Sequence, residues 1–132
     1  MSYMFSNCSN LIILDLPLID IKKVTNISHM FYQCNSIVSL NFPNNSPTLQ
    51  DMNYLFYNCT NLTYLDIRSF DTSKIDNMKY IFYGCEKLLS LNISNFITSN
   101  VINMEYMFAN CRSLETLDLS VFNTTVKLNK ID

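Results

Sequence analysis

Five cysteines could do more chemistry than any other residues of this chain, through disulfides, metal ligation or nucleophilic catalysis. They recur at intervals of 26, 25, 26 and 26 residues, the mark of a repeat. Stacked one repeat apart, at ~4.8 Å, their Cβ atoms would lie farther apart than the ~3.8 Å that a disulfide prefers. We therefore expect buried free thiols; the alternative is a disulfide or redox site. The cysteines are Cys8, Cys34, Cys59, Cys85 and Cys111.

Metal ligation and catalysis find little support in the other reactive residues. His29 is the sole histidine and no C-x-x-C pair occurs, so a zinc site is not expected. To act as a base for Cys34, His29 must lie within hydrogen-bond reach of the thiol. Residues five apart on a helix point to different faces, so we do not expect this pair. Carboxylates that recur singly do not form a calcium cage. We expect no enzyme, no metal and no cofactor.

Composition narrows the class of protein further. A net charge of -2 argues against binding to a nucleic-acid backbone, and a single glycine excludes glycine-rich phosphate loops. No apolar run approaches the ~18 residues needed to cross a bilayer. The first residues show no basic segment followed by an apolar one, so no signal peptide is visible.

The period of the cysteines extends to the residues around them. A phenylalanine stands three residues before each cysteine, and a leucine stands six residues after each one. Five copies of one unit therefore fill residues 1–132, which we interpret as a single repeat domain and as part of a longer array. The phenylalanines are Phe5, Phe31, Phe56, Phe82 and Phe108.

One segment of each unit has a helical spacing, seen most clearly in the fourth unit. Its apolar residues fall at i, i+3, i+4 and i+7, which is one face of a helix. Asn77 precedes the segment as a preferred N-cap residue, and Gly84 follows it with a residue type that tolerates the left-handed conformation. We predict a short helix from about Met78 to Tyr83. The apolar residues of this face are Met78, Ile81, Phe82 and Cys85.

After the cysteine the period changes to two, which predicts a short half-buried strand. Examples are Leu65-Asp66-Ile67 and Leu91-Asn92-Ile93, and a turn such as Phe70-Asp71-Thr72-Ser73 follows. The second unit departs from this pattern at Pro43 to Pro47, where we expect an irregular loop. The predicted fold is an α/β repeat solenoid of five coils, each with one short parallel strand and one short helix.

The fourth unit, residues 70–94, resembles the BspA-like leucine-rich repeat of bacterial and protist surface proteins. That repeat reads F-D-T-S-x-V-x-N-M-x-x-M-F-x-x-C-x-x-L-x-x-L-D-L-S, and the match covers essentially the whole chain. The resemblance implies a leucine-rich-repeat solenoid with a surface or adhesion role. It also implies a cell-surface or secreted location and no catalytic residues.

Outward positions of the predicted strands form the first candidate binding surface. Seven residues after successive cysteines, aspartate and asparagine alternate, which keeps stacked carboxylates two coils apart. We call equivalent positions of successive units a column. The column two residues before these acids and amides holds Tyr64, Ser90 and Thr116, and the column two residues after them holds Arg68 and Ser94. A ligand surface is one interpretation, and a solvated ladder of hydrogen-bonded side chains is the other. The candidate binding residues are Tyr64, Asp66, Arg68, Asn92 and Asp118.

Tyrosines form the second candidate surface, because seven of the eight lie in two columns of the predicted helix. Three residues apart, the columns share one face and would give an aromatic patch on the convex side. Alternatively the rings pack over neighbouring helices and only their hydroxyls contact water. The exposed fraction of the rings distinguishes these two interpretations. The candidate patch is Tyr54, Tyr57, Tyr80, Tyr83 and Tyr106.

These observations favour a non-catalytic protein-interaction or adhesion module, whose ligand is an unidentified protein or glycan. A structural spacer with no ligand of its own is the alternative. Met1 falls inside a predicted helix and the last unit stops before its next helix, so the repeat ends lack polar caps. We therefore expect a longer array or end-to-end self-association of the chain.

Overall fold

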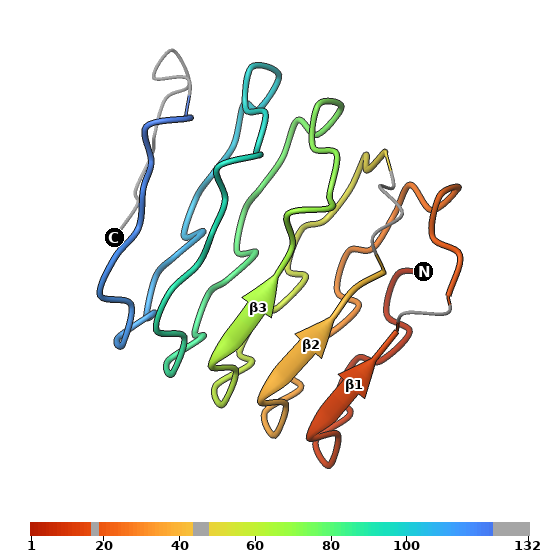
Figure 1. Cartoon of the computed structure of the whole chain (residues 1–132), viewed down its shortest axis with the longest axis vertical. Coiled ribbons are helices and arrows are strands. Elements are labelled where there is room, and N and C mark those ends of the chain that lie inside the picture. Colours follow the sequence, from red (N-terminus) through yellow and green to blue (C-terminus); the bar gives the residue numbers. More distant parts are fainter. Residues whose placement is uncertain (17–18, 44–47, 123–132) are drawn as a thin grey trace.

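The computed structural model describes residues 1–16, 19–43 and 48–122, and the chain winds there in coils stacked side by side in sequence order (Figure 1). Strands β1 (Ile13–Asp15), β2 (Ser39–Asn41) and β3 (Tyr64–Asp66) pair in parallel, in that order, within one sheet. Their register aligns Asp15 with Asn41 and Asn41 with Asp66, so equivalent residues of successive units are neighbours. In the fourth and fifth units a single parallel bridge between Ser90 and Thr116 replaces a strand.

The prediction of an α/β solenoid with a helix in each coil is wrong. The described residues contain no helix, and three short parallel strands are their only regular elements. Turns occupy the segments in which the helices were expected, including the one from Met78 to Tyr83.

The backbone hydrogen bonds of this segment explain why no helix forms. A helix would use each N–H within its own turn, but here alternate residues donate to the next coil. Met78 N donates to Asn103 O at 2.8 Å, and Phe82 N donates to Met107 O at 3.0 Å. Backbone N–H and C=O groups that are hydrogen-bonded to the next coil do not require a helix to satisfy them. A helix of under two turns is, in addition, unstable by itself.

Left-handed residues also interrupt any helical path through this segment. The residue before each cysteine has a positive φ, as expected for that column; Gly84 has a φ of 71° and Asn58 one of 55°. The tyrosine column was not expected to share this conformation, yet Tyr80 has a φ of 58° and Tyr54 one of 57°. Two left-handed residues four positions apart close two successive tight turns, which a right-handed helix cannot contain.

Asn77, predicted as an N-cap, caps a turn instead, and Asp51 does the same at the equivalent position of the preceding unit. Asn77 Oδ1 accepts a hydrogen bond from Lys79 N at 3.1 Å, and Asp51 Oδ1 accepts one from Asn53 N at 3.1 Å. Both side chains bond the backbone two residues ahead, the geometry of an Asx turn. The local chemistry of the cap was therefore predicted correctly, although the element that it starts was not.

The core consists of the apolar columns of the units stacked on one another. Met78, Ile81, Phe82 and Cys85 are fully buried, as their spacing predicts. Adjacent phenylalanine rings stack in parallel at centroid distances of 5.4 to 5.8 Å along the whole column. Each coil thus covers the apolar face of the next. The stacked rings are Phe5, Phe31, Phe56, Phe82 and Phe108.

The turns at Phe70 and Phe96 each enclose a buried aromatic ring. Phe70 and Phe96 are each 3% exposed, and Thr72 Oγ1 accepts a hydrogen bond from Ile97 N of the next coil at 2.8 Å. The irregular loop predicted at Pro43 to Pro47 lies at 44–47 outside the described residues. In the described part of the chain, no helix has the length and hydropathy that crossing a membrane requires.

Candidate functional site

The outward side chains of β3 and of the two coils after it surround two adjoining hollows. The first has a volume of about 260 Å³ and is lined by Tyr64, Leu65, Asp66 and Arg68 and by two residues of the next coil. The second has a volume of about 390 Å³ and lies one coil further on. Ser90 and Asn92 line both, so the hollows form one depression, the strand-face trough. Its polar residues are Tyr64, Asp66, Arg68, Ser90, Asn92, Ser94, Thr116 and Asp118.

A bidentate ion pair lies at one end of the strand-face trough. Arg68 Nη2 donates to Asp66 Oδ2 at 2.7 Å, and Arg68 Nε donates to Asp66 Oδ1 at 3.0 Å. The Arg68 side chain holds the pKa of the Asp66 carboxyl below its usual range, helped by the Arg68 backbone N–H. The pair therefore presents a planar, nearly neutral edge with further guanidinium donors.

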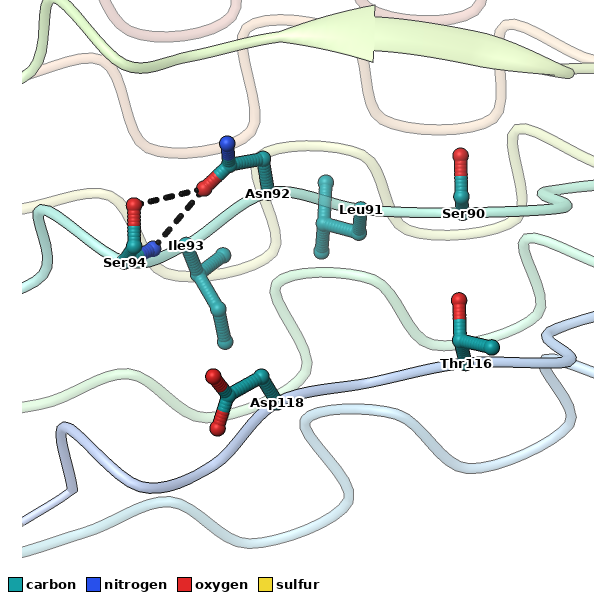
Figure 2. Close-up of a pocket in the computed structure, with 7 residues that line it drawn as sticks. All are labelled: Ser90, Leu91, Asn92, Ile93, Ser94, Thr116 and Asp118. Atoms are coloured by element: carbon teal, nitrogen blue, oxygen red, sulfur yellow. Dashed lines mark hydrogen bonds between the residues drawn. The ribbon is translucent and has the colours of Figure 1, made fainter.

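Asn92 and Asp118 lie on neighbouring coils in the second hollow (Figure 2). Asn92 Oδ1 accepts hydrogen bonds from Ser94 N at 3.0 Å and from Ser94 Oγ at 2.8 Å, which holds the amide in place. Asp118 Oδ1 accepts from Ser120 N at 2.8 Å, and bonding to Ser120 lowers the pKa of this carboxyl. Both side chains are exposed, so the remaining lone pairs of Asp118 and the N–H groups of Asn92 face solvent.

The trough offers groups that bind rather than react. Hydroxyl, amide, carboxylate and guanidinium groups supply donors and acceptors, and the Tyr64 side chain, 55% exposed, supplies an aromatic surface. All five binding residues predicted from the strand columns line the trough. The prediction omitted Ser90, Ser94 and Thr116. Their signal was their register, since they occupy the same outward columns as Tyr64 and Arg68.

Each of the five cysteines is a free thiol, as predicted; Cys34, Cys59 and Cys85 are buried, and Cys8 and Cys111 are half-buried. In four of them Sγ donates to a phenylalanine carbonyl of the preceding coil; Cys59, for example, donates to Phe31 O at 3.1 Å. Burial raises the pKa of Cys34 to about 11, and it raises the pKa of Cys59 further. This thiol ladder joins the coils, and the raised pKa values of Cys34 and Cys59 disfavour the thiolate, which is the reactive form.

The structure does not bring His29 and Cys34 together as a base and a nucleophile. The imidazole of His29 stacks between the rings of Tyr3 and Tyr54, at 4.5 and 4.7 Å. Cys34 Sγ instead donates to Phe5 O at 2.9 Å. Burial lowers the pKa of His29. Over the described residues, no group of three His, Cys, Asp or Glu side chains could hold a metal ion.

The predicted tyrosine patch forms two adjacent stacks of rings. Tyr54 and Tyr80 stack at 4.8 Å in one column, and Tyr57 and Tyr83 stack at 4.8 Å in the other. Tyr106 continues the first column, 5.1 Å from Tyr80. All five side chains are half-buried. This half-burial favours the second interpretation, in which the rings pack over one another and only their edges contact water. Burial also raises the pKa of the Tyr54 and Tyr57 hydroxyls.

Comparison with known proteins supplies a family and no function. No curated protein matches the chain, and neither does any solved structure. One protein-family model matches residues 1–88 and again residues 50–130. This match corrects the resemblance to the BspA-like leucine-rich repeat family. Because residues 1–16, 19–43 and 48–122 contain no helix, a leucine-rich-repeat solenoid is not supported. The surface or secreted location that the resemblance implied thereby loses its basis. Because the two matches together span nearly the whole chain, this protein belongs to the family described as "Mycoplasma protein of unknown function, DUF285".

Proposed function

We propose that the chain is a non-catalytic binding module whose ligand contacts the strand-face trough. The observation that carries the proposal is the convergence of Tyr64, Asp66, Arg68, Asn92 and Asp118 on adjoining hollows of one face. The core does not require these side chains, since all but Asp66 are exposed. Polar side chains gathered at a depression fit binding better than they fit stability.

Differences between coils support binding over a purely structural role. In the column of Tyr64, the first coil carries Ile13, which is 67% exposed and apolar. In the column of Arg68, the second coil carries Pro43. A structural spacer needs only the buried residues of each unit, so its outward residues have no reason to form a polar depression on particular coils. On the third to fifth coils, by contrast, polar residues of all three outward columns line the trough.

A matched pair of double variants tests the proposal. Asp66→Ala/Arg68→Ala removes one acid and one base from the trough. Lys74→Ala/Asp76→Ala removes the same charges from exposed positions that line neither of its hollows. Each protein is measured by surface plasmon resonance against purified matrix proteins and immobilised oligosaccharides. Thermal melting confirms that each variant folds.

We expect the wild-type chain and the Lys74/Asp76 variant to bind a common ligand, and the Asp66/Arg68 variant to lose at least tenfold in affinity. Loss of one charge-assisted bidentate contact is worth about 1.5–3 kcal/mol, which corresponds to a tenfold change or more. Equal binding by all three proteins would place the ligand elsewhere. Binding by none of them would favour the spacer.

A further inference from the structure

The strand-face trough carries few unpaired charges. Within residues 1–16, 19–43 and 48–122, Arg68 pairs with Asp66 and Arg112 pairs with Glu86. Asp118 therefore has no cationic partner among these residues. One unpaired carboxylate and no unpaired cation make the trough a poor site for nucleic acid, acidic peptide or sulfated sugar.

Neutral hydrogen-bonding groups outnumber charged ones in the second hollow. Ser90 and Thr116 contribute hydroxyls that both donate and accept, Ser94 contributes a hydroxyl oxygen that accepts, and Asn92 contributes amide N–H donors. Figure 2 shows the Ser90 and Thr116 side chains side by side on neighbouring coils. Alternating donors and acceptors of this kind suit a ligand rich in hydroxyls, whose own groups both donate and accept.

The Tyr64 ring adds an apolar surface to the polar trough. Its side chain is 55% exposed and lies beside Asp66 and Arg68 in the first hollow. An aromatic ring next to fixed polar groups can stack on the C–H face of a sugar ring while those groups bond the sugar hydroxyls. A protein partner would instead need a larger apolar centre. Exposed apolar residues such as Ile13, Val38 and Leu89 line neither hollow of the trough.

The spacing of the coils matches a repeating ligand. Parallel neighbours in a sheet lie ~4.8 Å apart, which is close to the length of one pyranose unit in a chain. The two hollows are one coil apart and share Ser90 and Asn92. A linear sugar chain laid across the coils would therefore present one ring to Tyr64 and the next to Asn92 and Asp118.

We infer that the ligand of the strand-face trough is a neutral glycan, held by stacking on Tyr64 and by hydrogen bonds to Asn92 and Asp118. This inference rests on the proposed function, since it names the ligand class of the same site. The site is open and its side chains are polar and mostly exposed, so recognition depends on hydrogen bonds and one ring, with little dependence on salt.

The test is an array of immobilised oligosaccharides, neutral, sulfated and sialylated, probed with the whole chain beside a panel of purified matrix proteins. Four variants accompany the wild type: Tyr64→Ala, Tyr64→Phe, Asn92→Ala and the Lys74→Ala/Asp76→Ala control. We expect retention on neutral oligosaccharides that persists at raised salt. Tyr64→Ala should weaken it about tenfold and Asn92→Ala by a similar factor, while Tyr64→Phe and the control bind as the wild type does.

The other outcomes separate the inference from the proposed function. Binding to a matrix protein that Asn92→Ala abolishes, with no retention on any sugar, would overturn the glycan while leaving the binding module intact. Retention on sulfated or sialylated sugars alone, lost at raised salt, would also overturn the neutral ligand. No binding in any arm would overturn both. Melting curves identify any variant that fails to fold, and Tyr64→Phe keeps the stacking ring for comparison.

Discussion

Cys59 shows how a single residue serves both the core and the stacking of coils. Its side chain is fully buried, and its Sγ donates to Phe31 O of the preceding coil. The same carbonyl accepts Cys34 N at 3.2 Å, so one oxygen links two coils. The sequence predicts the burial and the free thiol, because both follow from the period. The hydrogen bond to the preceding coil depends on the turn geometry, which the period does not reveal.

The buried thiols should react slowly in the folded protein. Burial raises the pKa of Cys34 and of Cys111 to about 11, so at pH 8 about one in a thousand is a thiolate. Ellman's reagent should therefore label them slowly in buffer and fast in urea. Rapid labelling of Cys59 or Cys85 in buffer, located by mass spectrometry, would contradict the buried ladder.

Substitution of Cys59 measures the contribution of the thiol ladder to stability. Cys59→Ala removes the sulfur from a filled core and the donor from Phe31 O, and it should lower the free energy of unfolding by about 1–3 kcal/mol. Cys8→Ala, at a half-buried position, is the control and should cost less. Urea denaturation gives both values. Equal losses at the two positions would show that stacking does not depend on the ladder.

At the scale of the element, the inward residues could be predicted and the element could not. Met78, Ile81 and Phe82 are buried as their helical spacing requires. Two successive tight turns bring residues three and four apart to the same side, just as a helix does, so the pattern alone cannot separate them. The difference lies in the N–H groups, which bond the next coil and depend on residues one unit away. The local sequence pattern therefore cannot show whether these N–H groups bond within the segment or to the next coil.

The left-handed turn position before the cysteine can be tested at Asn58. Its φ is 55°, a conformation that asparagine and glycine tolerate better than alanine. Asn58→Ala should lower the free energy of unfolding by about 1 kcal/mol, and Asn58→Gly should leave it nearly unchanged. Thermal or urea melts compare the two. If both variants lose the same amount, the asparagine side chain and not the backbone conformation matters there.

At the scale of the whole molecule, stacked coils place the same column of every unit in one line. The strand columns predict correctly that trough residues of successive coils are neighbours: Tyr64 and Ser90 line one hollow, and Ser90 pairs in parallel with Thr116. The depth of the trough could not be predicted, since it depends on how large each outward side chain is on three successive coils. The tyrosine columns illustrate the same limit, because ring exposure depends on the tilt of each ring against its neighbour.

Acid should destabilise the folded chain through its aspartates. Hydrogen bonds to Arg68, Ser73 and Ser120 lower the pKa values of Asp66, Asp71 and Asp118 respectively. Their stabilisation is complete above the ordinary aspartate pKa of 3.8 and is lost as the pH falls through the lowered folded values. Melting temperatures should hold steady between about pH 5 and 7 and fall below about pH 4. Asp71→Asn should reduce this acid dependence, and an unchanged profile would contradict its cause.

The location of the bound ligand tests the central claim most directly. Amide chemical shifts of the labelled chain are recorded while the oligosaccharide retained most strongly on the array is added. The strand-face trough predicts that the largest shifts fall at Tyr64 to Arg68, at Ser90 to Ser94 and at Thr116 to Asp118. Shifts confined to the tyrosine columns, at Tyr54, Tyr57, Tyr80 and Tyr83, would contradict it and assign the binding face to the opposite stretch of each coil.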